Sequence, residues 1–415
     1  MTDRVVIVGG GVVGAACALY LREAGIDVTI VDRGRFGGGC SHSNCGYVSP
    51  SHVLPIAGPG ILLDTLRTLF NRDSALKVRL RCDPQSLAWF YRFARRCTRA
   101  KMLEAAVGIR DLLVSSRALY DHLFGSTLRD VEWTAGGLLF VFASKAKMNH
   151  HAETNTLLSE RFGTPATRYD GDELTRFEPT LKPGIAGGWH YACDGHVSPE
   201  RLLESLRRAV CDRGVEIREQ VEVLGAEFTG RRLKRLVTDD GPIPADQVVV
   251  ATGAWTRSLR SLIGTRLPIE PGKGYSLTRS TPAVCPTHPM IFEEEHVAVT
   301  PMASGFRIGS TMEFAGFDES LRDDRLDLLR RGADRYLREP VGENFRERWC
   351  GLRPMTPDGR PYVGRAPRRD NVWVATGHGM LGLSMAPATG RLVSELLAGD
   401  VPHLDPRPYA VDRKL

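Results

Sequence analysis

The pattern of hydrophobic and polar positions predicts a β-α-β unit in the first 31 residues. Residues 5–8 form a β-branched apolar run that ends at a cluster of glycines. Apolar residues then recur at helical spacing over residues 12–24, and Gly25 marks the expected end of this helix. A second β-branched run, residues 27–31, supplies the next strand.

Beyond this unit the same criteria predict helices and strands without a tandem repeat. Residues 50–125 are mostly helical in pattern, most clearly at 61–69 and 87–96. The other predicted helices are residues 146–162, 202–213 and 388–397. The other predicted strands are residues 137–142, 187–191, 215–218, 247–251 and 371–375, with strand-like segments and Pro/Gly turns across 265–315.

The glycine cluster at residues 9–14 fits the dinucleotide-binding pattern G-x-G-x-x-G between a strand and a helix. In this pattern Gly9 permits a tight turn, Gly11 lets the backbone approach a pyrophosphate, and Gly14 allows helix and strand to pack closely. Asp32 ends the second strand, where a carboxylate accepts hydrogen bonds from ribose hydroxyls and disfavours a 2′-phosphate. The alternative is a glycine-rich turn with a purely structural role.

A second G-x-G-x-x-G pattern covers residues 377–382, but no strand with an acidic end follows it in the sequence. We therefore expect a loop and helix N-terminus placed against a ring that gains negative charge on reduction, as a flavin does. Residues 248–255 form a buried strand with a small-residue turn, which resembles the second adenine-side strand of FAD enzymes.

The predicted fold class is α/β, with two domains that interweave along the chain. We expect β-α-β elements from both ends of the chain to form a nucleotide-binding domain, and an antiparallel sheet from the middle to form a substrate-binding domain. The expected boundaries are residues 1–80, 190–262 and 346–415 for the first domain, and 81–189 and 263–345 for the second.

Charge and cysteine content limit the partners and the compartment. The net charge of +6 comes with no nucleic-acid motif, so nucleic acid is not expected as a partner. The basic stretch 92–101 is predicted to be a solvated helix face, with an anionic membrane or substrate as the alternative. Nine cysteines without a C-x-x-C pair predict no metal site and a reduced, cytoplasmic chain. Residues 53–70 are predicted as a buried helix; peripheral contact with the inner face of the cell membrane is the alternative.

Five separated parts of the sequence resemble one known family. One is the amino-terminal fingerprint. The second is residues 40–46, whose family form is T-S-x-x-N-x-G, and residues 49–50 and 57–60 follow it at the family spacing. The other three are residues 271–276 (K-G-Y-S), 351–359 (G-x-R-P-x-T-P-D-G) and 377–382 (G-H-G-x-x-G). They resemble the FAD-dependent D-amino-acid oxidase superfamily, and within it the bacterial D-amino-acid dehydrogenases of the small-subunit type. Cys40 stands where the family carries threonine and His52 where the best-known dehydrogenases carry tyrosine, so the substrate is expected to differ from theirs.

The resemblance implies a Rossmann-like FAD-binding domain of the glutathione-reductase type, interwoven with an α+β substrate domain that contains a mixed or antiparallel sheet. FAD is expected to bind non-covalently, because relatives with covalent flavin use a cysteine elsewhere than Cys40 or Cys45. The residues expected to hold FAD are Gly9, Gly11, Val12, Val13, Gly14, Asp32, Arg33, Ser41, Asn44, Gly46, Val221, Thr252, Gly253, Gly377, His378, Gly379, Met380, Leu381 and Gly382.

An amino acid held for oxidation needs its carboxylate fixed, and a planar guanidinium binds a carboxylate through two hydrogen bonds. Arg353 matches the family arginine with this role; pairing with a local acid such as Asp358 is the alternative. Tyr275 would donate its hydroxyl to the same carboxylate, or else belong to the core. His52 and His378 are predicted as polar walls of the pocket, and the resemblance assigns no general base.

The predicted function is oxidation of a small D-amino acid, including proline-like ones, to an imine that water hydrolyses to a 2-oxo acid. The electron acceptor is expected to be a quinone, another carrier or dioxygen. Alternatives are a glycine or sarcosine type of amine oxidase, an aromatic hydroxylase of the same FAD fold, and a non-catalytic flavoprotein subunit of a larger amine dehydrogenase.

Overall fold

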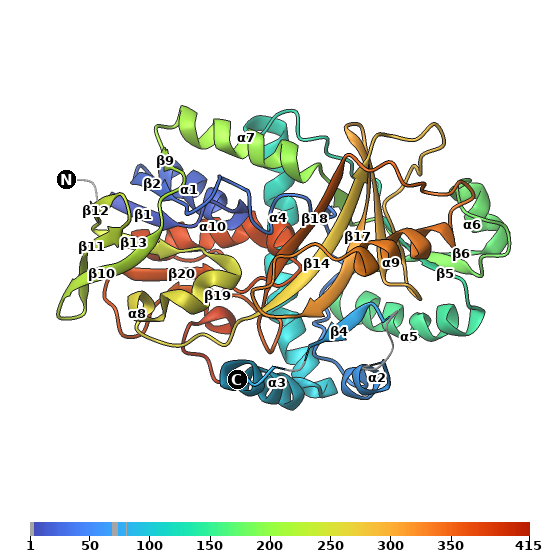
Figure 1. The fold of residues 1–415 in the computed structure, drawn as a ribbon, viewed down its shortest axis with the longest axis horizontal. Helices are drawn as coiled ribbons and strands as arrows, with labels where there is room; N and C mark the ends of the chain where they lie inside the picture. The colour runs from blue at the N-terminus through green and yellow to red at the C-terminus, as the bar shows by residue number, and fades with distance from the viewer. Residues whose placement is uncertain (1–3, 69–73, 80) are drawn as a thin grey trace.

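The computed structural model describes residues 4–68, 74–79 and 81–415. One half of the molecule is built on six strands: β1 (Arg4–Val8), β2 (Asp27–Val31), β9 (Glu216–Arg218), β13 (Gln247–Val250), β19 (Tyr362–Arg365) and β20 (Val372–Thr376). Their order in the sheet is β19-β20-β13-β1-β2-β9, and all neighbours run parallel except β19 and β20 (Figure 1). The predicted β-α-β unit and the α/β fold are confirmed.

Both faces of this sheet are buried, because alternate residues of β1 enter two different cores. Val5 and Ile7 pack in one core with the helices α1 (Val12–Glu23), α4 (Arg99–Ser126), α7 (Pro199–Asp212) and α10 (Gly382–Ala398). Val6 and Val8 pack in the other with α8 (Arg260–Ile263) and with the antiparallel sheet of β10 (Val223–Thr229), β11 (Arg232–Thr238) and β12 (Gly241–Pro244). The sheet therefore forms the middle layer of a three-layer domain.

The other half contains a nine-stranded mixed sheet. Its strands are β4 (Leu76–Val78), β5 (Leu138–Phe142), β6 (Thr167–Asp170), β7 (Gly187–Tyr191), β14 (Glu270–Arg279), β15 (Met290–Phe292), β16 (Val297–Met302), β17 (Gly305–Phe314) and β18 (Glu347–Met355). The order is β18-β14-β17-β16-β15-β5-β7-β6, with β4 on β17; only the β15–β5 and β17–β4 pairs are parallel. The helix α9 (Asp323–Asp334) packs on this sheet.

The remaining elements connect the two halves or lie at their edges. They are α2 (Ile61–Thr68), α3 (Pro84–Arg96), α5 (Lys145–Phe162), α6 (Gly171–Phe177), the short helices η1 (Gly253–Leu259) and η2 (Arg407–Tyr409), and the small pair β3 (Tyr47–Val48) with β8 (Gly195–His196). Among the described residues, none of the helices combines the length and the apolar character needed to cross a bilayer.

Two predictions about the chain's organisation are wrong in part. The segment predicted as a buried helix over 53–70 contains α2 only from Ile61, and Leu62 and Leu63 are 38% and 61% exposed; residues 69 and 70 lie outside the described residues. The boundary at 346 also fails, because β18 pairs with β14 and belongs to the nine-stranded sheet. Likewise β4 joins that sheet although residues 1–80 were assigned to the nucleotide-binding domain. The rest of the domain division remains a proposal.

Candidate active site

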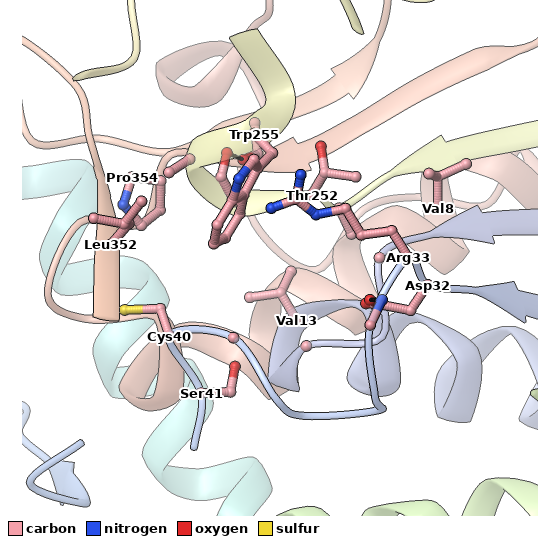
Figure 2. Close-up of a pocket in the computed structure, with 18 of the residues that line it drawn as sticks. Val8, Val13, Asp32, Arg33, Cys40, Ser41, Thr252, Trp255, Leu352 and Pro354 are labelled. Atoms are coloured by element: carbon pink, nitrogen blue, oxygen red, sulfur yellow. Dashed lines mark hydrogen bonds between the residues drawn. The ribbon is translucent and has the colours of Figure 1, made fainter. Parts of the chain in front are cut away.

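A cavity of about 540 Å³ opens at the carboxyl ends of β1, β2 and β13 and extends to β18 (Figure 2). Ligands of parallel α/β sheets bind at these strand ends. Most of the residues predicted to hold the cofactor line it: Gly9, Gly11, Val12, Val13, Asp32, Arg33, Ser41, Asn44, Val221, Thr252, Gly253, His378, Gly379, Met380 and Gly382. Gly14, Gly46, Gly377 and Leu381 are not among the lining residues, and the first three of these shape the backbone behind it.

The amino-terminal glycine turn requires glycine for steric reasons. Gly9 has a φ of 109°, and a Cβ added there would lie 2.6 Å from the carbonyl oxygen of Ala251. A Cβ on Gly14 would collide with the carbonyl oxygen of Gly9, so only glycine lets α1 pack this closely. The first turn of α1 faces the cavity, and its amides and dipole favour a phosphate group there.

Asp32 is held rigidly at the end of β2. Its Oδ2 accepts a hydrogen bond from the Gly10 amide at 2.7 Å, and its Oδ1 accepts one from the Gly34 amide at 2.8 Å. Each carboxylate oxygen keeps a second lone pair for a ribose hydroxyl. Next to it the guanidinium of Arg33 lies 4.4 Å from the centroid of the Trp255 ring, and both side chains line the cavity (Figure 2).

The loop of residues 39–46 contributes Gly39, Cys40, Ser41 and Asn44 to the lining of the cavity. Asn44 shapes this loop, because its Nδ2 donates to the Ser41 carbonyl at 2.9 Å and its Oδ1 accepts from the Gly46 amide at 2.8 Å. The Ser41 hydroxyl oxygen accepts from the Val12 amide at 3.0 Å and so ties the loop to α1. Burial raises the pKa of the Cys40 thiol to about 11, so this side chain remains a neutral thiol at pH 7.

Three charged side chains anchor the same loop: Glu347 of β18, Arg307 of β17 and Glu200 of α7. His42 Nε2 lies 2.7 Å from Glu347 Oε1, and the Ser43 hydroxyl donates to the other oxygen of Glu347. The guanidinium of Arg307 pairs with Glu200 at 2.5 Å. The side-chain oxygens of Glu200 and Glu347 and a ring nitrogen of His42 lie within 4.8 Å of one another, and the guanidinium of Arg307 lies 2.5 Å from Glu200 and 3.9 Å from Glu347. The cluster therefore serves as an ionic anchor for the loop.

The carboxyl-terminal glycine loop closes the cavity at the start of α10. The Gly379 amide donates to the Pro354 carbonyl at 3.0 Å, which joins this loop to β18. His378 Nε2 lies 3.0 Å from the Thr389 hydroxyl, and burial lowers the pKa of His378 to about 3. His378 is therefore neutral at pH 7 and lines the cavity, and its role as a polar wall stays a prediction.

Arg353 projects from β18 into the wall of the cavity. Its Nη1 donates to the Thr311 carbonyl at 2.6 Å, and the structure shows no ion pair between Arg353 and any described acid. Asp358 instead binds Arg360 at 2.9 Å and Arg413 at 3.0 Å, so the alternative pairing of Arg353 with Asp358 is wrong. Burial lowers the pKa of Arg353, and a bound carboxylate would offset this cost.

Two predicted substrate contacts do not reach the cavity. The Tyr275 hydroxyl donates to Glu313 Oε2 at 2.7 Å, so it has no free donor for a substrate carboxylate; the core role is what the structure shows. The His52 ring lies 5.5 Å from the Phe140 ring and is not among the residues that line the cavity. Burial lowers the pKa of His52 to about 4, and this residue is therefore neutral.

Comparisons with known proteins agree with this geometry. The family model described as FAD dependent oxidoreductase, DAO, matches residues 4–396. The chain belongs to this family. D-amino acid dehydrogenase 2 of Mesorhizobium japonicum is 33% identical over 412 residues, which is 97% of this chain and 98% of that protein. D-amino acid dehydrogenase of Methylobacterium nodulans is 34% identical over 429 residues, covering 97% and 96% of the two chains.

Solved structures of the family share the fold. Glycine oxidase from Geobacillus kaustophilus has a TM-score of 0.81 at 24% identity and covers 100% of both chains. L-proline dehydrogenase from P. horikoshii has a TM-score of 0.75 at 20% identity and covers 98% of this chain and 97% of its own. The family match, together with the dehydrogenase relatives, shows that the chain is an FAD-dependent oxidoreductase and that FAD is its cofactor. Residues of both glycine turns line the cavity, as a bound dinucleotide requires.

Sequence reasoning missed several residues that shape the site. Leu352 lines the cavity although no role was predicted for it, and Trp255 lines it although only its segment, 248–255, was likened to an FAD-binding strand. Thr311 and Gly274 contact the guanidinium of Arg353 from β17 and β14. The signal for Gly274 was present, since a glycine inside a strand marks a close approach by another group. Thr311 had no such signal, because its contact depends on strand pairing.

Proposed function

We propose that the chain oxidises a small D-amino acid to its imine, which water then hydrolyses to a 2-oxo acid and ammonia. The amino acid loses a hydride from Cα and a proton from nitrogen, and with a proline-like substrate the product is a cyclic imine. Support comes from the family, from the named activity of relatives about one-third identical to this chain, and from the cavity. FAD, when bound, supplies the two-electron acceptor.

Arg353 is the observation that carries the proposal. One edge of its guanidinium is bound to a backbone carbonyl, while Nη2 and Nε make no hydrogen bond to the described residues. An arginine in a cavity wall without an acidic partner provides a site for a carboxylate. The substrate carboxylate would therefore bind there, which directs the rest of the molecule along the cavity wall.

The histidine that lines the cavity favours transfer without a protein base. Burial lowers the pKa of His378 to about 3, so its imidazole is a weak proton acceptor. The amine would thus enter in its neutral form. The amino-terminal end of α10 faces the cavity through His378, Gly379 and Gly382, so its dipole stabilises negative charge that develops on the cofactor side.

The test is anaerobic mixing of the FAD-loaded protein with D-amino acids, L-amino acids, glycine, sarcosine and hydroxyprolines, while flavin absorbance is followed. We expect bleaching by one or more D-amino acids and little by their L-enantiomers. Bleaching by none of them would refute the proposal, and reduction by NADPH alone would instead support a hydroxylase.

The role of Arg353 is tested by Arg353→Leu. Loss of a charge-assisted pair should raise the KM at least about 100-fold, or about 2.7 kcal/mol, with FAD still bound. Arg348 lies on the same strand but is exposed and pairs with Asp323, so Arg348→Leu is the matched control and should change KM less than about twofold. Equal effects of the two substitutions would remove the assignment.

The acceptor is proposed to be a quinone or another carrier, as the dehydrogenase names of the relatives favour. The assay is peroxide release under air compared with reduction of an added quinone analogue. Stoichiometric peroxide, especially with glycine or sarcosine, would indicate an oxidase instead.

Peripheral membrane contact is proposed for the face of α3. Leu87 and Tyr91 lie one helical turn apart and are 59% and 64% exposed, and Arg95 follows with its guanidinium 5.8 Å from the Tyr91 ring centroid. Exposed apolar and basic side chains in such a row suit an anionic bilayer surface. Sedimentation with vesicles of anionic lipid, but not with neutral ones, is expected, and Leu87→Ser with Tyr91→Ser should abolish it. Equal recovery with both vesicle types would contradict the proposal.

A further inference from the structure

The strand pairing beside Arg353 is broken at one place. Tyr275 of β14 pairs with Ser310 of β17, whereas Lys273 pairs with Glu313, so β17 has one more residue than β14 in this interval. Such a β-bulge turns the backbone locally. Here Ser310 and Thr311 have φ angles of 103° and 54°, which side-chain-bearing residues rarely adopt. Strained backbone of this kind is frequent at ligand-binding sites.

The bulge and the facing glycine enclose the guanidinium of Arg353. A Cβ added to Gly274 would lie 2.6 Å from Nη1 of Arg353 and closer still to Cζ and Nη2. The guanidinium therefore lies directly over the backbone of Gly274, diagonally across from its own position on β18, where Arg353 pairs with Gly272. On the other side, the Thr311 carbonyl accepts from Nη1 at 2.6 Å.

Hydrogen bonds to Glu313, which follows the bulge on β17, hold the bulge in place. Glu313 is fully buried and accepts hydrogen bonds from the Tyr275 hydroxyl at 2.7 Å and from Arg79 Nε at 2.8 Å. These contacts join β17 to β14 just beyond the bulge and fix the position of the Thr311 carbonyl. The Thr311 hydroxyl is buried and has no hydrogen-bond partner among the described residues, so side-chain bonding does not compensate the strain at this residue.

We propose that Gly274 and the bulge at Thr311 position the guanidinium of Arg353 so that Nε and Nη2 face the substrate carboxylate. Gly274 and Thr311 are positioning residues, since they act through Arg353. The carbonyl occupies Nη1, and the absence of a side chain at Gly274 lets the planar group lie flat in the orientation that a two-point contact needs. This inference rests on the proposed role of Arg353.

The test is Gly274→Ala in the FAD-loaded protein. The atoms that the new methyl group meets are the end of a flexible side chain, so the guanidinium should move while the sheet and the flavin site remain. We expect KM for the D-amino acid, and the dissociation constant of benzoate measured by flavin absorbance, to rise about tenfold or more with unchanged FAD content. Gly125→Ala in α4, away from the cavity and with open space around an added Cβ, is the matched control and should change neither.

A double-mutant comparison separates positioning from a general structural effect. In the Arg353→Leu background Gly274→Ala should alter KM less than about twofold, because the group it displaces is gone. In the Arg353→Lys background, where no planar guanidinium meets the methyl group, the loss should also be small. If Gly274→Ala alone does not fold, the Arg353→Lys protein with and without Gly274→Ala is compared instead. The same tenfold loss in either background would overturn the inference.

The outcomes also distinguish this inference from the proposed function. If Arg353→Leu leaves KM and benzoate binding unchanged, the proposed carboxylate site fails. If Arg353→Leu weakens both but Gly274→Ala weakens neither, only the positioning role fails.

Discussion

The substitution Asp358→Asn is expected to lower the free energy of unfolding and to leave substrate affinity unchanged. Asp358 is 1% exposed and binds two guanidiniums, Arg360 through Oδ2 at 2.9 Å and Arg413 through Oδ1 at 3.0 Å. The two arginine side chains are 7% and 6% exposed. Asparagine keeps the shape of the side chain but removes the negative charge between two buried cations.

The magnitude follows from the partners that remain. Removing one partner of a buried ion pair costs about 3 to 5 kcal/mol. Arg360 keeps Glu104 at 3.3 Å, and Arg413 keeps hydrogen bonds to the carbonyls of Arg360 at 2.7 Å and Pro361 at 2.9 Å. We therefore expect a loss near the lower limit, about 3 kcal/mol.

The pH dependence has a definite sign. Burial alone would raise the pKa of Asp358, but Arg413 and Arg360 outweigh it and hold the pKa below its usual value. A group with a depressed pKa in the folded state contributes stability above its unfolded pKa of about 3.9, and this contribution is lost as pH falls through the folded value. The difference between the native protein and Asp358→Asn should therefore be full at pH 7 and decrease in acid.

Urea unfolding of the FAD-loaded protein, followed by tryptophan fluorescence, measures this difference. Asp405→Asn is the control, because Asp405 and Arg407 form an exposed pair whose loss costs less than about 1 kcal/mol. Equal effects of the two substitutions would refute the reasoning. A KM increase for Asp358→Asn as large as that for Arg353→Leu would show that Asp358 orients Arg353 after all.

Two further predictions concern the cofactor and its loop. Gly14→Ala should yield colourless protein without FAD, because the new Cβ would collide with the Gly9 carbonyl and open the turn. The control Gly125→Ala in α4, where a Cβ meets open space, should stay yellow. A yellow Gly14→Ala protein would contradict the packing argument. Hydrogen bonding to Glu347 raises the pKa of His42, so their pair stabilises the fold below the unfolded histidine pKa of about 6.5 and weakens as pH rises through the folded value. Thermal unfolding of His42→Gln should differ from the native protein by less than about 1 kcal/mol in acid and not at alkaline pH, because both groups are partly exposed; a difference that does not change with pH would contradict this.

The parts of the fold that the sequence predicts correctly depend on local patterns. The strand, the glycine turn and the helix from Val12 follow from apolar periodicity and from the positions where only glycine fits. The helix predicted over 388–397 was correct in type but begins at Gly382, because the apolar run is interrupted by Pro387 near its start. Elements of this kind carry their signals within a few residues.

The errors concern contacts between residues far apart in the sequence. The hydroxyl of Tyr275 binds Glu313, a partner 38 residues away that exists only because β14 and β17 pair. The exposure of Leu62 and Leu63 likewise depends on how α2 sits at the edge of the molecule, which helical periodicity does not determine. The short strand β4 was missed because three residues beside a helical segment carry too weak a pattern. Arg353 was predicted as the carboxylate-binding residue through family resemblance rather than spacing.

Comparison of the buried guanidiniums explains why Arg353 differs from the others. Arg307 pairs with Glu200, and Arg360 pairs with Asp358, so both are neutralised within the chain. Arg325 has no carboxylate at hydrogen-bond distance in the part of the chain that the structure describes, but both of its Nη atoms donate to backbone carbonyls, at 2.7 and 2.9 Å, away from the cavity. In Arg353 only Nη1 donates to a backbone carbonyl of the described residues, and the side chain lines the cavity. Desolvating a cation without compensation is costly, so this arrangement favours an anionic ligand that completes the hydrogen bonding.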